Sequence, residues 1–444
     1  MAQNFLSCDR DQVLLLPPDM SEWLPAGHLA RFVIELADQL DLSEIYGYYR
    51  QDGHGRPAHD PAMMTALVLY NYAVGVTSSR AIERRCEVDV ACRVIAANRV
   101  PDHATIARFL IRHREVLQGL FFQVLGLCRR AGMVRVGTVA VDSTKLAANA
   151  SVDQNRTLEG LREEARRIIE EAIETDQLED ELYGDCRGDE LPDELADPRT
   201  RAGRIRELLE QADAEAEAVR GEVGEAKQVE AEIRAGTRRR TVGRPRKTEL
   251  TGQQRQRLER KYNLTDPDSR VVRHRGMLMQ GYNVQTVVGE GQIILAIDAG
   301  EQPVDQRQLL PAIQTLQGNL ARVGIDEAPS EVLADGGYWN AEQVSELQRQ
   351  KLRVLVPPNP SKARAIDRLQ PAAQQMIALL QSEEGKQAYQ QRQALVEPVF
   401  AQTKHIRGIT RLLRRGKQAV QAELDLIATG HNLLKLYRHS LAIA

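Results

Sequence analysis

A long charged stretch in the middle of the chain, residues 157–261, limits what this sequence can fold into. It holds almost no aromatic residues, and Glu, Arg, Ala and Gln recur at helical spacing. Such a composition cannot bury enough apolar surface for a normal core and is typical of long exposed helices that form a hairpin or coiled-coil arm. The remaining residues must supply the cores. At 444 residues in all, we expect two or three domains.

The residues before this stretch predict a compact helical bundle. Apolar residues recur at helical spacing between short turns, and Asp102 and either Ser78 or Ser79 are plausible N-caps. Such helices are typical of a helix-turn-helix whose basic side chains bind DNA, but they fit a packing domain with a solvated basic face equally well. The helical segments are 61–75, 78–97 and 104–132, and the basic residues are Arg108, Arg112, His113 and Arg114.

Strand signals appear on both sides of the charged stretch. Residues 133–149 predict one strand, and alternation in 277–300 predicts two more, joined at a Gly-Glu-Gly turn. The order of elements that follows is typical of an α/β layer with a mixed sheet, and the charged stretch is a segment inserted into that layer. We expect a helix at 305–322, a strand at 330–334, a helix after Asn340, a strand at 353–358, and helices at 371–411 and from 417 to the end.

Two acids follow predicted strands directly. Asp142 ends the apolar run Val139 to Val141, where an ionised carboxylate is costly unless it is capped, paired or bound to a metal. Asp335 ends the run Val332 to Ala334 and precedes two glycines, which allow close backbone approach. Both acids therefore lie at strand ends, where open α/β sheets tend to form their sites.

A third acid, Glu397, lies in the most apolar part of a predicted helix over residues 389–416. Lys404 follows seven residues later, so an α-helix would place both side chains on one face, two turns apart. A carboxylate and an ammonium in this order suit a metal ion and an adjacent phosphate.

Convergence of the three carboxylates would force at least one to hold a proton unless divalent cations neutralise them. Ligands that are all oxygen favour Mg²⁺ or Mn²⁺ over Zn²⁺. Two such ions, about 3.5 to 4 Å apart, stabilise the entering and leaving oxygens of an in-line phosphoryl displacement. We therefore expect two Mg²⁺ or Mn²⁺ ions per site, which would accept the charge of Asp142.

Structural alternatives stay open for each acid. Asp142 and Asp335 could be cap or turn residues, and Glu397 could form an ion pair with Arg392 or Lys404. When the three acids are considered together, two at strand ends and one on a later helix, these structural alternatives are less favoured than they are for each acid alone. The rival acids are Asp298 and Asp305.

Several spaced motifs resemble those of DDE-type transposases of bacterial insertion sequences. They are GRPAHDPAMM, PDHATIARF, VAVDSTKL, NLTDPDSR, GYNVQTVV, VLADGGY and VEPVFAQTKHIRG, and together they cover nearly the whole chain. The resemblance implies an RNase H-like catalytic core with a helical DNA-binding domain before it and a helical insertion after its first strand. The implied divisions are the N-terminal domain at 1–130, the core at 131–156 and 262–416, the insertion at 157–261, and a C-terminal helix at 417–444.

The resemblance also implies roles for single residues. The catalytic, metal-binding acids fall on Asp142, Asp335 and Glu397, with Asp142 bridging both ions. The family's tyrosine-arginine-glutamate-lysine signature falls on Tyr389, Arg392, Glu397 and Lys404, although four residues separate Arg392 from Glu397 where the best-known form has three. The implied activity is to cut DNA at the ends of the element and to join the freed 3′-hydroxyl to target DNA.

DNA contacts are expected at three further places. Residues 404–417 contain six Lys or Arg and no acid, and this run is expected to bind phosphates through Arg411, Arg414 and Arg415. The segment GRPRK resembles a minor-groove AT-hook, with Arg244, Arg246 and Lys247 as its basic residues. Tyr338 and Trp339, beside Asp335, could stack on a base, or could be core residues.

The net charge of −3 is compatible with DNA as a partner, because residues 170–197 concentrate thirteen acids and offset the basic segments. Pairing two element ends, the terminal inverted repeats, predicts a homodimer. Five cysteines at spacings of neither a zinc module nor a disulfide framework, and the lack of a long apolar run, predict a cytoplasmic protein without membrane contact. The resemblance implies that this protein is bacterial and nucleoid-associated. Two alternatives stay open: an inactive or repurposed DNA-binding protein, and a purely hydrolytic nuclease.

Overall fold

The computed structural model describes residues 20–49, 57–167, 201–234, 260–274, 276–300, 302–358 and 371–443. The N-terminal region is helical, as predicted, and Asp102 caps one of its helices by accepting a hydrogen bond from the backbone N–H of Thr105. The elements of this region are η1 (Met20–Glu22), α1 (Leu29–Ala37), α2 (Ser43–Tyr48), α3 (Pro61–Ala73), α4 (Ser79–Val88), α5 (Val90–Ile95), α6 (His103–Arg112) and α7 (Arg114–Arg130).

The centre of the molecule is a mixed sheet. Its strands are β1 (Thr138–Ala147), β4 (Arg270–His274), β5 (Met277–Val288), β6 (Ile294–Gly300), β7 (Glu331–Ala334) and β8 (Arg353–Leu355). The order across the sheet is β6-β5-β1-β7-β8, with β4 also paired to β5. The first three strands in this order alternate in direction, and β7 and β8 run parallel to β1. The predicted α/β class and the hairpin in residues 277–300 are confirmed, whereas β4 was not foreseen.

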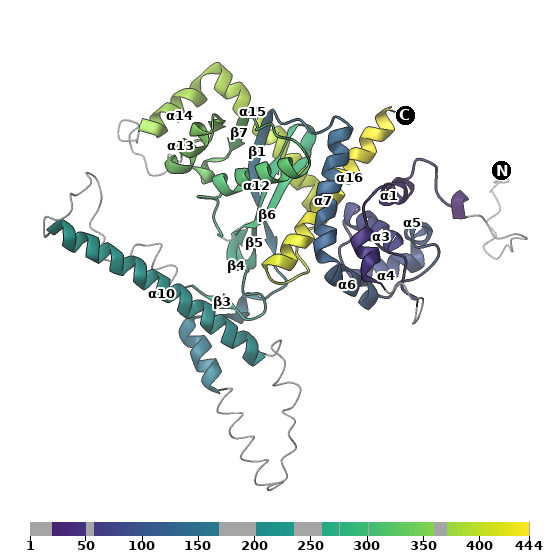
Figure 1. Cartoon of the computed structure of the whole chain (residues 1–444), viewed down its shortest axis with the longest axis horizontal. Coiled ribbons are helices and arrows are strands. Elements are labelled where there is room, and N and C mark those ends of the chain that lie inside the picture. The colour runs from purple at the N-terminus through teal and green to yellow at the C-terminus, as the bar shows by residue number, and fades with distance from the viewer. Residues whose placement is uncertain are drawn as a thin grey trace, which may run out of the picture.

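Helices cover the sheet and join it to the N-terminal region (Figure 1). Helix α12 (Leu309–Arg322) packs on β5 and β6, and α15 (Glu383–Ala401) packs on β1 and β7. Helix α16 (Lys417–Ile443) follows the edge strand β6, where the side chains of Gln421 and Asn432 hydrogen-bond to the strand backbone. This pairing satisfies backbone groups that an open edge would leave exposed.

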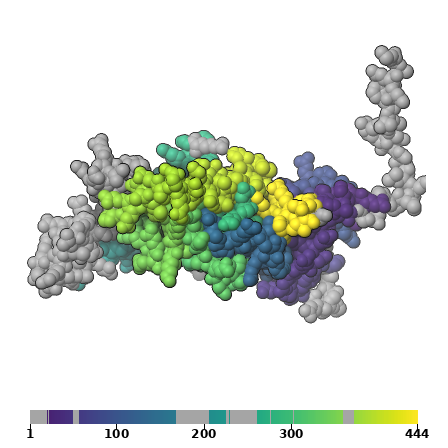
Figure 2. Space-filling view, turned by 90° about the horizontal axis from the view of Figure 1, so that it is seen from above, coloured from purple at the N-terminus to yellow at the C-terminus, as the bar shows by residue number. Residues whose placement is uncertain are grey.

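The C-terminal helix also connects the two halves of the chain. Helix α16 packs against α7 and α3 as well as β6, and Figure 2 shows its end emerging between the N-terminal helices and the rest of the C-terminal part. Gly430 of α16 allows this contact, because a Cβ there would stand 2.9 Å from the backbone nitrogen of Ala73 in α3. The remaining helical elements of the second half are η3 (Glu290–Gln292), η4 (Gly336–Tyr338), α13 (Ala341–Arg349) and α14 (Pro371–Gln381).

The insertion leaves the core after β1. A short 3-10 turn, η2 (Val152–Gln154), leads to β2 (Asn155–Arg156), which pairs with β3 (Tyr262–Asn263) at the other end of the insertion. One long helix, α10 (Arg201–Arg234), projects from this base (Figure 1). Leu161, Ile205, Leu208, Ala212, Tyr262 and Leu264 form a small separate core there.

The helix predicted through residue 416 is wrong beyond Ile406. Helix α15 ends at Ala401 and continues as one π-helical turn, η7 (Gln402–Ile406), after which Gly408 adopts a positive φ of 67°. The chain then runs beside the end of β1, where Ala147 exchanges backbone hydrogen bonds with Thr410 and Leu412. Among the described residues, none of the helices has both the length and the apolar character needed to cross a membrane.

Candidate active site at the ends of two parallel strands

Sheet register places Asp142 and Asp335 at neighbouring positions. Val141 of β1 pairs with Ala334 of β7 in the parallel ladder, so the two acids come next on adjacent strands. Paired residues of neighbouring strands project to the same face. Burial raises the pKa of Asp142, and the nearby carboxylate of Asp335 adds to this rise, while the Ser143 backbone N–H and Arg392 oppose it. The structure thus brings together the two strand-end acids.

Arg392 of α15 supplies a cation to this pair. Its Nη1 lies 2.8 Å from Oδ2 of Asp142, and both side chains are largely buried. Tyr389, one turn earlier, is half-buried. Burial raises the pKa of its hydroxyl, Arg392 opposes this rise, and Asp335 adds to it. Two residues of the predicted signature therefore face the strand-end acids, and Arg392 pairs with Asp142 instead of with Glu397.

Glu397 lies on the exposed side of α15. It follows Arg392 by five residues, which is about 140° around an α-helix. Within the described ranges, no three His, Cys, Asp or Glu side chains are grouped so that they could hold a metal ion. The role of Glu397 as the third acid stays a prediction.

Lys404 lies in the π-helical turn, so it does not continue the α-helical spacing expected from Glu397. Its Nζ donates a hydrogen bond of 2.7 Å to the backbone carbonyl of Lys145, three residues after Asp142. π-helical turns occur frequently at functional sites, where they redirect side chains. Here the turn directs an ammonium group to the strand that carries Asp142.

The basic run after Lys404 is an irregular segment beside β1. Nε of Arg411 donates to the carbonyl of Ala148, and Nε of Arg415 donates to that of Asn149 at 2.9 Å; both side chains are exposed. Arg414 is partly buried, and its backbone N–H donates to Glu423. Arg244, Arg246 and Lys247 lie outside the described residues.

Tyr338 belongs to the core. Its side chain is fully buried, and its hydroxyl donates a hydrogen bond to Oε1 of Gln285. It is therefore not free to stack on a DNA base, which corrects that expectation and favours the core alternative. Trp339 is partly buried and packs against the same core.

The donor set at the strand ends fits a hard divalent cation. Asp142 and Asp335 offer only oxygen ligands, which Mg²⁺ and Mn²⁺ prefer. The position beside Asp142 already attracts a positive charge, the guanidinium of Arg392. Two neighbouring carboxylates are a donor pair of the kind that such cations bind.

Two segments of the chain match known protein families. Residues 18–112, which span α1 to α6, match a family described as a transposase domain (DUF772). Residues 358–437, which include Tyr389, Arg392, Glu397 and Lys404, match a family described as a transposase DDE domain. Two separate segments of the chain are thus similar to transposase domains, the second of them to a DDE domain. No curated protein and no solved structure is significantly similar to it.

The protein has a further polar cluster, which the sequence did not predict as a group. Asp305, one of the rival acids, accepts hydrogen bonds from Asn283 and Gln285 of β5 and lies 3.7 Å from Nζ of Lys145. The signal in the sequence was the repeated placement of polar residues on strands that are otherwise buried. Their convergence depends on the β1–β5 register, which the sequence did not predict.

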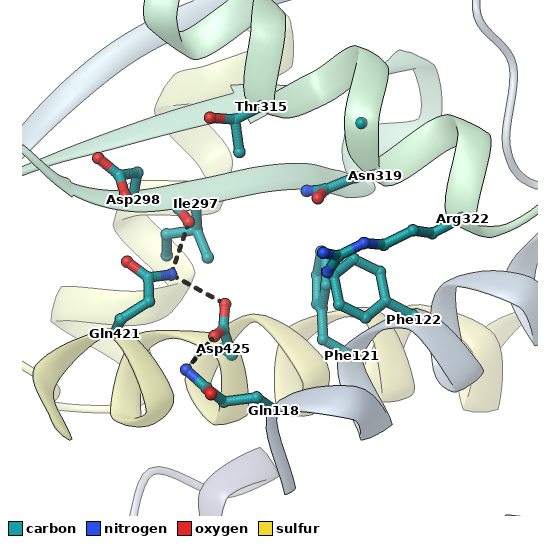
Figure 3. A pocket seen from close by; sticks show the side chains of 11 residues that line it. Gln118, Phe121, Phe122, Ile297, Asp298, Thr315, Asn319, Arg322, Gln421 and Asp425 are labelled. Atoms are coloured by element: carbon teal, nitrogen blue, oxygen red, sulfur yellow. Dashed lines mark hydrogen bonds between the residues drawn. The ribbon is translucent and has the colours of Figure 1, made fainter. Parts of the chain in front are cut away.

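The other rival, Asp298, lines a separate cavity of about 410 Å³ between α7, α12, β6 and α16 (Figure 3). Asp425 lies in the same cavity and accepts hydrogen bonds from Gln118 and Gln421. Burial is the main reason that the pKa of Asp425 is raised to about 7, and Asp298 adds to the rise. Asp298 is therefore not part of the strand-end pair.

Proposed function

We propose that this protein is a DDE-type transposase that cuts DNA at the ends of its element and joins the freed 3′-hydroxyl to target DNA. In this proposal Asp142, Asp335 and Glu397 are the acids that hold divalent cations. The observation that carries the proposal is the neighbouring position of Asp142 and Asp335 beneath α15. Glu397 joins them in the proposal because it lies on the helix whose Arg392 contacts Asp142 and within the matched DDE domain.

We also propose that the core is RNase H-like. Support comes from the strand order β6-β5-β1-β7-β8, with three antiparallel strands followed by two parallel ones and with the first acid on the central strand. The covering of β1 and β7 by the helix that carries Glu397 agrees with this arrangement. In this proposal residues 131–156 and 262–416 form the core, and residues 1–130 bind DNA.

The divalent ions, when bound, lower the pKa of a water or hydroxyl nucleophile and neutralise charge on the phosphate. The chain's own residues hold and orient the reactants. Asp142 and Asp335 accept the cation charge, and Arg392 is released from Asp142 to pair with a phosphate, to which guanidinium groups bind well. Lys404 then holds a phosphate beside the cut.

DNA continues from this site across the segment after η7. Arg411 and Arg415 are exposed, and the hydrogen bonds that they make use only Nε, so each guanidinium presents further N–H groups to phosphates. We propose a homodimer as the active form, since two element ends have to be held together.

The test incubates the full-length protein with Mn²⁺, supercoiled target DNA and DNA that carries element ends. Joined products are expected from the wild type, and Glu397→Gln is expected to abolish cleavage while DNA binding in a gel shift stays nearly intact. Glu383→Gln is a matched control, because Glu383 is an exposed acid on the same helix, paired with Lys386.

The outcomes separate the alternatives. Nicking without joined products supports a purely hydrolytic nuclease, and shifted DNA bands without any cleavage support a DNA-binding protein without catalysis. Unchanged cleavage by Glu397→Gln would remove that residue from the site.

A further inference from the structure

The face of the sheet opposite Asp142 carries a block of polar side chains. Ser143 and Lys145 of β1 lie directly across from Gln285 and Asn283 of β5 in the antiparallel register, so all four project to one face. Asn283 and Gln285 are almost fully buried, which is costly for amides unless they are hydrogen-bonded.

Asp305, just before α12, is the common partner of this block. Its Oδ1 accepts hydrogen bonds from Nδ2 of Asn283 at 2.9 Å and from Nε2 of Gln285 at 3.1 Å. Nζ of Lys145 lies 3.7 Å from the same oxygen and also donates to Oδ1 of Asn283. Although burial acts to raise it, the pKa of Asp305 is held below its ordinary value by these partners and by Ser143, so the carboxylate is ionised.

The network extends to Asp335. Gln285, which donates to Asp305, accepts the hydroxyl hydrogen bond of Tyr338, three residues after Asp335. Gly337 lies between Asp335 and Tyr338 in the sequence, and its backbone N–H donates to Oδ1 of Asp335. A Cβ at Gly337 would stand 3.0 Å from Oδ1 of Asp335 and 3.6 Å from Oδ2 of Asp305, so the two carboxylates flank this glycine.

The network also extends to the strand of Asp142 and to Lys404. Ser143 contacts Asp305 through its side chain, while its backbone N–H donates to Oδ1 of Asp142 at 2.7 Å. Lys145 faces Asp305 with its ammonium group and accepts the Lys404 hydrogen bond with its carbonyl. Asp305 therefore contacts Ser143 beside Asp142 directly and is linked through Gln285 and Tyr338 to the turn that follows Asp335.

We propose that Asp305 is a positioning residue that fixes Asp142 and Asp335 relative to each other and so sets the affinity of their site for divalent cations. The inference rests on the proposed function. Groups that hold metal ligands in place through hydrogen bonds typically change metal affinity by about 10- to 100-fold when they are removed. Asp305 acts through Ser143, Gln285 and Tyr338, one chain of contacts for each strand end.

The experiment measures Mn²⁺ binding to the full-length protein through the electron paramagnetic resonance signal of free Mn²⁺, together with Mn²⁺-dependent DNA cleavage. Asp305→Asn keeps the size of the side chain and one acceptor oxygen but removes the charge. The expected result is a rise in the Mn²⁺ Kd of about 10-fold or more, with cleavage recovering as Mn²⁺ is raised. Asp298→Asn is the matched control, because Asp298 also follows buried residues at the end of a strand but lines the separate cavity, and it is expected to leave the Kd unchanged.

Tyr338→Phe provides a second test without a change of charge and covers the case in which Asp305→Asn does not fold. It removes the hydrogen bonds of the Tyr338 hydroxyl with Gln285 and Ser143 and is expected to raise the Mn²⁺ Kd by a smaller factor. A thermal midpoint lowered in either variant while the Mn²⁺ Kd stays at the wild-type value would show a purely structural role and overturn the inference. Wild-type protein that neither binds Mn²⁺ nor cleaves DNA would instead overturn the proposed function, and the inference with it.

Discussion

Arg392 and Asp142 form an ion pair between α15 and β1, with 2.8 Å between Nη1 and Oδ2 and side chains that are only 13% and 18% exposed. The guanidinium opposes the rise in the Asp142 pKa that burial causes. It supplies, from the protein itself, the positive charge that the proposed function assigns to a divalent cation. In the proposed function, metal binding at Asp142 would exchange one counter-ion for another.

Arg392→Gln is expected to destabilise the metal-free protein by roughly 1–3 kcal/mol, because Asp142 loses its cation in a largely buried place. Added Mn²⁺ should reduce this loss, which thermal unfolding with and without the ion would measure. Lys386→Gln breaks an exposed pair on the same helix and should cost at most about 0.5 kcal/mol. Equal losses in the two variants would contradict a special role for the Arg392 pair.

Gly75→Ala is expected to loosen the contact between the N-terminal helices and the segment after η7. Gly75 has a φ of 92°, and a Cβ there would stand 2.0 Å from the backbone oxygen of Arg407. Gly276 has a φ of 82°, and a Cβ there would meet nothing within 4 Å, so Gly276→Ala measures the backbone strain alone. Backbone strain alone costs roughly 1–3 kcal/mol. In thermal unfolding, Gly75→Ala should therefore lower the stability by more than Gly276→Ala does.

The raised pKa of Asp425 predicts that the protein loses stability as pH rises. Its pKa is about 7 in the folded protein against an ordinary 3.8, so the folded state binds more protons than the unfolded state between these values. Stability should therefore fall from about pH 4 to pH 7 and then level off, by up to roughly 4 kcal/mol at 1.4 kcal/mol per pKa unit. Asp425→Asn should flatten this part of the pH profile of the thermal midpoint; a profile as steep as that of the wild type would refute the assignment.

Arg415→Gln is expected to weaken DNA binding evenly across sequences and to reduce the slope of log K against log salt by about 1, as loss of one phosphate contact does. Arg349→Gln is a suitable control, since Arg349 is 72% exposed at the end of α13, where it pairs with Glu346. Filter binding at several salt concentrations would give both slopes. If the two variants share the wild-type slope, the segment after η7 does not contact phosphates.

The sequence predicted those parts of the fold that local patterns control. Asp102 caps a helix, and the turn around Gly291 joins two antiparallel strands, as their residue types indicated. The end of the helix carrying Glu397 was misplaced because residues 407–416 keep helical composition. Arg407 is instead buried and donates to the carbonyls of Tyr72 and Ile427, contacts with distant residues that no local pattern contains.

The candidate site was predictable in part for the same reason. Acids that end two strands could be recognised one by one, and the parallel register of β1 and β7 makes them neighbours. The face that Arg392 presents to Asp142 depends on helix rotation across a sequence separation of 250 residues. Asp305 meets the amides of Asn283 and Gln285, 22 and 20 residues earlier, through the tertiary fold and not through a local sequence pattern. These relationships appear only in the folded chain.

The short pairing of β2 with β3 has a consequence for how this protein can change. Asn155 lies opposite Asn263 and Arg156 opposite Tyr262, so the inserted chain departs and comes back at a single two-residue base. We therefore expect that lengthening, trimming or exchanging what lies beyond that base leaves the alignment of β1 with β5 unaltered. For the same reason we expect that the sequence of the inserted segment can vary, and that a reporter domain can be inserted there, without disturbing the strand-end acids.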